Sequence, residues 1–180
     1  MGLFRKATPP HQTALAMIGV RAGDRLLAAG RPEPAVIAEL ARSTGLSGQT
    51  LVVSPPSGRT PYDKAAADAG VLIEVIDAAA DTHVVPQNSG DHDVVVLHFD
   101  LVTLDVTTRD RLAISAFSAV RPSGRVVVIE GRAQTGWFST RSASLTPDDV
   151  MAMLTRAGGI AVRHLSTADG VMYFEARKPR

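Results

Sequence analysis

Short apolar runs alternate with segments of helical periodicity along this 180-residue chain, and this alternation constrains its fold more than any other feature. Parallel strands need crossover connections, so a chain that repeatedly places a helix between two apolar runs favours a parallel sheet. Five such runs are expected to be strands, at residues 24–28, 50–53, 71–76, 93–97 and 125–130. The pattern therefore predicts an α/β fold with a five-stranded parallel core.

The end of the chain carries a different signal, because two apolar runs at residues 160–165 and 171–176 flank the turn Ala168-Asp169-Gly170. A connection this short can only join antiparallel strands. Helices are expected at residues 11–19, 34–44, 61–69, 108–120 and from 146 to the glycine pair at 158–159, covering both faces of the sheet. The sequence predicts one domain over residues 1–180, with a helical lead at 1–22 and a core at 23–178.

The turn between the first strand and the next helix contains Gly30, Pro32 and Pro34. Proline has no amide hydrogen and a fixed φ, so this turn offers a ligand few backbone donors. Two interpretations of Gly30 stay open: it lets the backbone approach a bound cofactor, or it only permits a strand-to-helix turn with positive φ. The prolines indicate a rigid loop under either interpretation.

Composition argues against several classes of function. The 19 basic and 18 acidic side chains give a net charge of +1, which provides no electrostatic footprint for nucleic acid or an anionic membrane. The absence of cysteine excludes disulfides, zinc–thiolate sites and thiol catalysis, and it is typical of a cytoplasmic protein. The five histidines lack paired ligand spacing, so we expect no metal site, and no apolar run reaches the ~20 residues of a membrane helix.

Four short motifs occur in order along the chain: GDRLL at 23–27, VIDA at 75–78, HDVVV at 92–96 and VRPSGRV at 120–126. Together they resemble the class I S-adenosylmethionine-dependent methyltransferases over residues 15–178, with a nearest similarity to small-molecule methyltransferases of quinone biosynthesis. The resemblance implies a Rossmann-like sandwich with a C-terminal antiparallel hairpin and S-adenosylmethionine as the cofactor. A nicotinamide dinucleotide site is disfavoured, because the loop lacks the G-x-G-x-x-G pattern.

The resemblance also assigns cofactor-binding positions. Gly30 is what remains of the family's glycine loop, and Ala28 stands where the family has an acid that helps to fix the methionine ammonium. Ser54 stands where an acid accepts hydrogen bonds from both ribose hydroxyls, and Asp77 would face the adenine amino group. Because a hydroxyl is not a bidentate anionic acceptor, Ser54 should weaken binding by roughly 1.5–3 kcal/mol, or about 10- to 150-fold. Each residue also has an interpretation without a ligand, since Ser54 would end a strand and Asp77 would cap a turn.

His98 and Asp100 are the candidate catalytic residues. They follow the expected fourth strand at the carboxyl edge, where open α/β sheets bind ligands. The resemblance implies that this segment lines the transfer site, and His98 could act as a general base because an imidazole titrates near neutrality. The alternative is a loop histidine near a capping aspartate. Trp137, in the long segment 131–145, would cover a substrate, contact a partner or pack under the sheet edge.

Two functions of different classes follow from these residues. The first is an S-adenosylmethionine-dependent methyltransferase that binds its cofactor weakly and methylates a small molecule. The second is a catalytically inactive pseudo-methyltransferase that serves as an interaction or assembly module, as a homo-oligomer or with a protein partner. The intact frame and Asp77 favour the first, whereas the altered loop, Ala28 and Ser54 favour the second.

Overall fold

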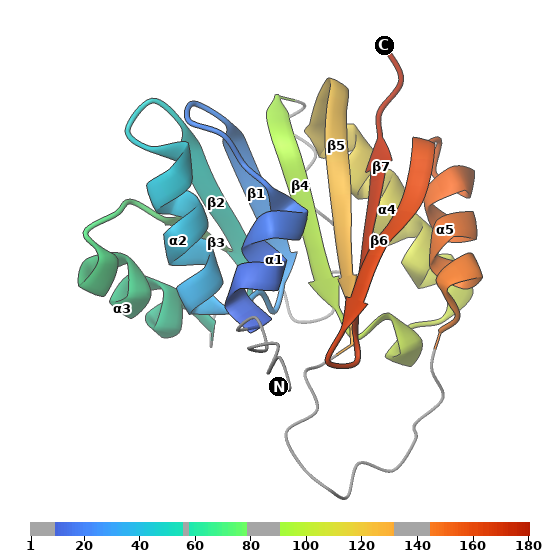
Figure 1. Cartoon of the computed structure of the whole chain (residues 1–180), viewed down its shortest axis with the longest axis horizontal. Helices are drawn as coiled ribbons and strands as arrows, with labels where there is room; N and C mark the ends of the chain where they lie inside the picture. The colour runs from blue at the N-terminus through green and yellow to red at the C-terminus, as the bar shows by residue number, and fades with distance from the viewer. Residues whose placement is uncertain (1–9, 56–57, 79–90, 132–144) are drawn as a thin grey trace, which may run out of the picture.

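A seven-stranded sheet organises the computed structural model of the chain, which describes residues 10–55, 58–78, 91–131 and 145–180 (Figure 1). The strands follow the spatial order β3-β2-β1-β4-β5-β7-β6. Their bounds are Arg25–Gly30 (β1), Gln49–Ser54 (β2), Glu74–Asp77 (β3), His92–Phe99 (β4), Val120–Glu130 (β5), Ile160–Ala168 (β6) and Val171–Arg177 (β7). Because the strand order reverses between β1 and β4, the sheet has a topological switch point there.

Strands β1 to β5 are parallel, and β7 pairs antiparallel with both β5 and β6. At the centre, Ala28 on β1 lies beside Val52 on β2 and Val96 on β4. The central parallel strands are buried along almost their whole length because helices cover both faces, whereas β6 at the edge is largely exposed. The predicted α/β sandwich, with five parallel strands and a C-terminal antiparallel hairpin, is confirmed.

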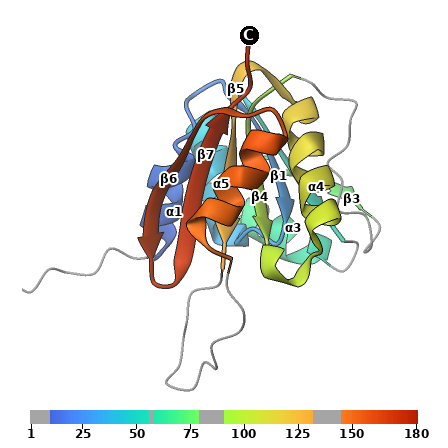
Figure 2. The ribbon, with the colours of Figure 1, turned by 90° about the vertical axis from the view of Figure 1, so that its right-hand side faces the viewer.

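Helices pack on the sheet in two layers (Figure 2). They are α1 (Pro10–Ile18), α2 (Pro34–Thr44), α3 (Arg59–Ala69), α4 (Val106–Ala119) and α5 (Pro147–Arg156), with a short 3-10 helix η2 (Leu101–Thr103). Helices α4 and α5 bury one apolar cluster against the sheet, and α1, α2 and α3 bury another on the opposite face. In the part of the chain that the structure describes, no helix is long and apolar enough to cross a membrane.

Local signals explain where the helices begin and end. At the start of α5, the Thr146 hydroxyl accepts from the Asp149 amide and the Asp149 carboxylate accepts from the Thr146 amide, which completes a capping box. Pro147 and Pro34 occupy the first turns of α5 and α2, where the missing N–H costs nothing. Gly45 ends α2 with a φ of +68°.

Several boundaries differ from the sequence prediction, and three of them have a clear physical reason. Strand β3 begins at Glu74 rather than at residue 71, because its pairing with β2 starts there. Helix α4 begins at Val106 rather than at residue 108, because Asp105 caps it. Strand β5 begins at Val120, where the sequence predicts a helix end and a turn, because Val120 pairs with His92 across a bulge.

Candidate functional site

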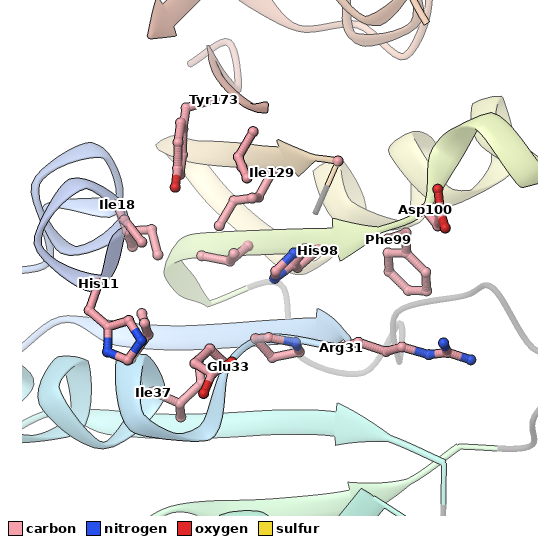
Figure 3. Close-up of a pocket in the computed structure, with 16 residues that line it drawn as sticks. His11, Ile18, Arg31, Glu33, Ile37, His98, Phe99, Asp100, Ile129 and Tyr173 are labelled. Atoms are coloured by element: carbon pink, nitrogen blue, oxygen red, sulfur yellow. The ribbon is translucent and has the colours of Figure 1, made fainter. Parts of the chain in front are cut away.

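A cavity of about 600 Å³ lies beneath α1 at the carboxyl end of the sheet, at the switch point between β1 and β4 (Figure 3). Its walls come from α1, the turn after β1, α2, the ends of β4 and β5, and β7. Open parallel sheets bind ligands at this position, and the volume is typical of small-molecule sites. The residues labelled around it are His11, Ile18, Arg31, Glu33, Ile37, His98, Phe99, Asp100, Ile129 and Tyr173.

The cavity combines apolar walls with polar side chains. Val96 and Ile129 on the central strands and Ile18 on α1 are buried around it. Arg31 and Glu33, from the turn after β1, also line the cavity and are exposed to solvent. Such a lining can bury an apolar molecule and orient it through a few polar groups.

The two candidate catalytic residues, His98 and Asp100, both line this cavity. The sequence suggested that His98 follows the fourth strand, but the residue lies inside β4. The strand continues to Phe99 because it pairs with β1 and β5. Alternation along the strand places His98 on the same face as Val96, toward α1. Tyr173 on β7 adds a buried phenol, whose pKa is raised by burial and by Asp169, so its hydroxyl stays protonated at neutral pH.

Gly30 is the last residue of β1 and has a φ of +101°. A Cβ atom added there would lie 2.1 Å from the carbonyl oxygen of His98 on β4. The neighbouring Arg31 amide donates to that same carbonyl at 2.8 Å. Contact with β4 therefore explains the glycine without a ligand, and its role in cofactor binding stays a prediction.

The turn after β1 is anchored to α3 through Pro32. The Pro32 carbonyl accepts a hydrogen bond of 2.7 Å from the hydroxyl of Tyr62, and both residues are buried. Burial and the nearby Glu33 raise the pKa of Tyr62, so the hydroxyl remains a donor. The turn is thus held in place by α3, and the positions of Pro32 and Pro34 have no amide hydrogen for a ligand.

Ser54 and Asp77, the other two candidate cofactor residues, do not line the cavity. They end β2 and β3 and lie side by side in the sheet. Ser54 is 3% exposed, and a Cβ atom added to Gly58 at the start of α3 would lie 2.1 Å from its Oγ atom. The structure therefore separates the candidate site residues into two groups. Beside the cavity lie Gly30, His98 and Asp100, and beneath the start of α3 lie Ser54 and Asp77.

Arg59, which the sequence analysis missed, is the partner of Asp77. Its Nε donates to the Asp77 carboxylate at 3.3 Å, and its Nη2 donates to the Val75 carbonyl at 2.8 Å. The sequence signal for Arg59 was a basic residue directly after Gly58, at the start of the helix that leads to β3.

Glu130 is a second residue that the sequence analysis missed. It ends β5 with 4% exposure, and its carboxylate accepts from the Leu101 amide at 2.9 Å. Burial raises the pKa of this carboxyl group. Glu130 thus fixes the segment directly after His98 and Asp100, and an acid that ends an apolar strand was the available signal.

Three positions that the resemblance assigns to S-adenosylmethionine, on β1, β2 and β3, do not hold it in the family's manner. Ala28 is fully buried and offers no acid, and Ser54 is covered by Gly58. The carboxylate of Asp77 is engaged by Arg59. Among the described residues, no group of three His, Cys, Asp or Glu side chains could hold a metal ion. Trp137, for which the sequence analysis left three roles open, lies outside the described residues.

Several solved structures with a similar fold are described as methyltransferases. SibL, an S-adenosylmethionine-dependent methyltransferase in its apo form, matches 95% of this chain with 21% identity and a TM-score of 0.73. A putative O-methyltransferase from Nostoc punctiforme matches 94% with 16% identity and a TM-score of 0.74. An S-adenosylmethionine-dependent methyltransferase from Aquifex aeolicus matches 93% with 15% identity and a TM-score of 0.66.

The chain spans 55% of SibL and 56% of the Nostoc protein, but 89% of the Aquifex protein. No family profile matches the chain, and no curated protein matches its sequence. The structural matches confirm the class I methyltransferase fold that the four sequence motifs indicated.

Proposed function

We propose that the protein is a small-molecule methyltransferase that binds S-adenosylmethionine weakly and takes its methyl acceptor in the cavity beneath α1. The observation that carries the proposal is the cavity of about 600 Å³ at the switch point, lined by both His98 and Asp100. Solved methyltransferases with this fold support the choice of cofactor, and one of them, human N-acetylserotonin methyltransferase, is in complex with it.

The chain's own residues would position and deprotonate the acceptor. The apolar walls at Val96 and Ile129 would exclude water from it, and the Tyr173 hydroxyl would donate a hydrogen bond. The His98 imidazole would take the proton from the acceptor's nucleophilic atom, as a general base positioned at the strand end. Asp100 would hold the polar end of the acceptor.

The cavity also borders the turn after Gly30, the candidate cofactor contact, so filling the cavity should block the cofactor as well as the acceptor. Ala14 lines the cavity, whereas Ala16 is exposed on the same helix, so Ala14→Phe and Ala16→Phe form a matched pair. Equilibrium dialysis with S-adenosylhomocysteine and circular dichroism would be run on both. The proposal expects Ala14→Phe to lower affinity at least about tenfold while remaining folded, and Ala16→Phe to bind like the natural chain. Unchanged binding by a folded Ala14→Phe protein would contradict the placement of the site.

A second candidate function is a pseudo-methyltransferase that acts as an interaction or assembly module. It is favoured by the start of α3, where Gly58 covers Ser54 and Arg59 engages Asp77. A folded protein that binds neither S-adenosylmethionine nor S-adenosylhomocysteine would support this candidate over the first.

A further inference from the structure

We infer that the methyl acceptor is an uncharged ring compound that carries a hydroxyl group and, on the opposite side of the ring, an oxygen atom that accepts a hydrogen bond. The hydroxyl group lies against His98 on β4, and the second oxygen accepts from the hydroxyl of Tyr173 on β7. Both side chains line the cavity beneath α1. The inference deepens the proposed function and rests on it, because that proposal places the acceptor in this cavity and makes His98 the general base.

The register of the sheet aligns the two residues in one row. His98 on β4 pairs with Ile129 on β5, and Ile129 pairs with Tyr173 on β7. Paired residues point to the same face of a sheet, and all three line the same cavity. Neighbouring strands are about 4.8 Å apart, so the backbones of His98 and Tyr173 are separated by roughly 10 Å, with Ile129 between them. A flat ring that rests on Ile129 can therefore reach both polar side chains.

The Tyr173 hydroxyl faces the cavity without a hydrogen-bond partner among the described residues. The residue is only 4% exposed, and Figure 3 shows its hydroxyl pointing into the cavity. A buried hydroxyl without a partner costs free energy, and a ligand oxygen that accepts its hydrogen would recover that cost. Burial raises the pKa of this phenol, so at neutral pH the hydroxyl keeps the hydrogen that it would donate.

The surroundings of Tyr173 favour an uncharged ligand. Its neighbours in the cavity wall, Ile129 on β5 and Val171 on β7, are apolar and buried. Asp169 lies close enough to raise the pKa of the Tyr173 hydroxyl, so its negative charge would also repel a carboxylate at this point. Arg31, a cation in the cavity lining, follows β1, which is separated from β7 by β4 and β5. An anion at the Tyr173 end would lie far from that cation, and burying an unpaired charge is costly.

The test is calorimetric titration of the full chain with four phenols of similar size. 4-Hydroxyacetophenone has the inferred arrangement, and 2-hydroxyacetophenone carries the same two oxygens on adjacent positions of the ring. 4-Isopropylphenol lacks the second oxygen, and 4-hydroxybenzoate is charged there. 4-Hydroxyacetophenone should bind at least about fivefold more tightly than each of the others, because they leave the Tyr173 hydroxyl unpaired or place a charge beside it.

Tyr173→Phe removes the hydroxyl and keeps the ring, so the variant should remain folded by circular dichroism. It should bind 4-hydroxyacetophenone no more tightly than 4-isopropylphenol. Its affinity for 4-isopropylphenol should not fall, because that ligand accepts no hydrogen bond from Tyr173. This second comparison controls for damage to the cavity.

Any of the other three phenols that binds the natural chain as tightly as 4-hydroxyacetophenone would overturn the inference. So would a failure of all four to bind at millimolar concentration, or a preference that survives in a folded Tyr173→Phe protein. Titration with S-adenosylhomocysteine separates the inference from the proposed function. A chain that binds S-adenosylhomocysteine without a preference among the phenols keeps the proposed function and refutes the inference. A chain with the Tyr173-dependent preference that ignores S-adenosylhomocysteine retains the ligand class of the cavity, while the proposed function fails.

Discussion

The carboxyl edge of the sheet has two halves that differ in what fills them. The half at β1, β4 and β5, which we call the cavity half, opens into about 600 Å³ beneath α1. The half at β2 and β3, which we call the α3 half, is occupied by the chain itself, since Gly58 covers Ser54 and Arg59 pairs with Asp77. The difference shows that a single helix start is enough to fill one half of the carboxyl edge while the other half keeps a cavity of small-molecule size.

The largest expected effect concerns Gly30 in the cavity half. Gly30→Ala should destabilise the protein by about 2–6 kcal/mol, because it combines a positive φ of +101° with a Cβ atom 2.1 Å from the His98 carbonyl oxygen. Urea unfolding followed by circular dichroism measures the loss. Gly70→Ala is the control, because Gly70 has a φ of +64° but nothing within 4 Å, and it should cost only about 1–2 kcal/mol. Equal losses would show that contact with β4 is not the reason for Gly30.

The next effect sharpens the contrast at the α3 half. Ser54→Asp restores a charged acceptor at the end of β2, so it should tighten S-adenosylhomocysteine binding by about 10- to 150-fold. Ser47→Asp, on the exposed loop before β2, adds the same charge at the opposite end of the strand and should leave the affinity for S-adenosylhomocysteine unchanged. Calorimetry on both variants gives the comparison.

The next prediction concerns the pH dependence of stability. It rests on His92, which lies away from both halves of the carboxyl edge. His92 is 1% exposed at the start of β4, and neither ring nitrogen has a hydrogen-bond partner among the described residues. Burial, and secondarily Arg25, lower its pKa below the ordinary value of 6.5. The unfolded chain therefore binds a proton at this histidine before the folded chain does, and the contribution of His92 to the free energy of unfolding should fall by up to about 1.4 kcal/mol for each pH unit below 6.5, until the folded pKa is reached.

Urea unfolding between neutral pH and mild acid measures this dependence. His92→Leu should remove it, whereas His11→Gln, a change at an exposed residue of α1, should retain it. A His92→Leu protein whose stability still falls in the same pH range would assign the effect to other groups.

The smallest expected effect is that of Arg59 on stability. The Arg59 and Asp77 side chains are 44% and 46% exposed, so Arg59→Met should change the free energy of unfolding by less than about 1 kcal/mol. Thermal and urea unfolding of the variant measure it. A loss of several kcal/mol would show that Arg59 is a structural clamp of β3.

Apolar patterning predicted the sheet, because parallel strands that are buried on both faces need continuous apolar runs such as 93–97. Such a run can be recognised in the sequence without knowledge of what packs against it. The patterning also placed His98 and Asp100 at the edge where the cavity lies. Patterning could not predict the bond between Tyr62 and Pro32 or the pair of Arg59 with Asp77, because only tertiary packing brings those residues together. The role of α1 as a cavity wall was missed for the same reason, since nothing local distinguishes it from a peripheral helix.

Calorimetric titration of the natural chain with S-adenosylhomocysteine tests the central claim most directly. The account predicts one-to-one binding, weaker than that of Ser54→Asp by about 10- to 150-fold, because the cavity half is open and the α3 half lacks its acid. No heat of binding at millimolar ligand, from a protein shown to be folded, would contradict the proposed cofactor. Binding as tight as that of the Ser54→Asp protein would contradict the distinction between the two halves.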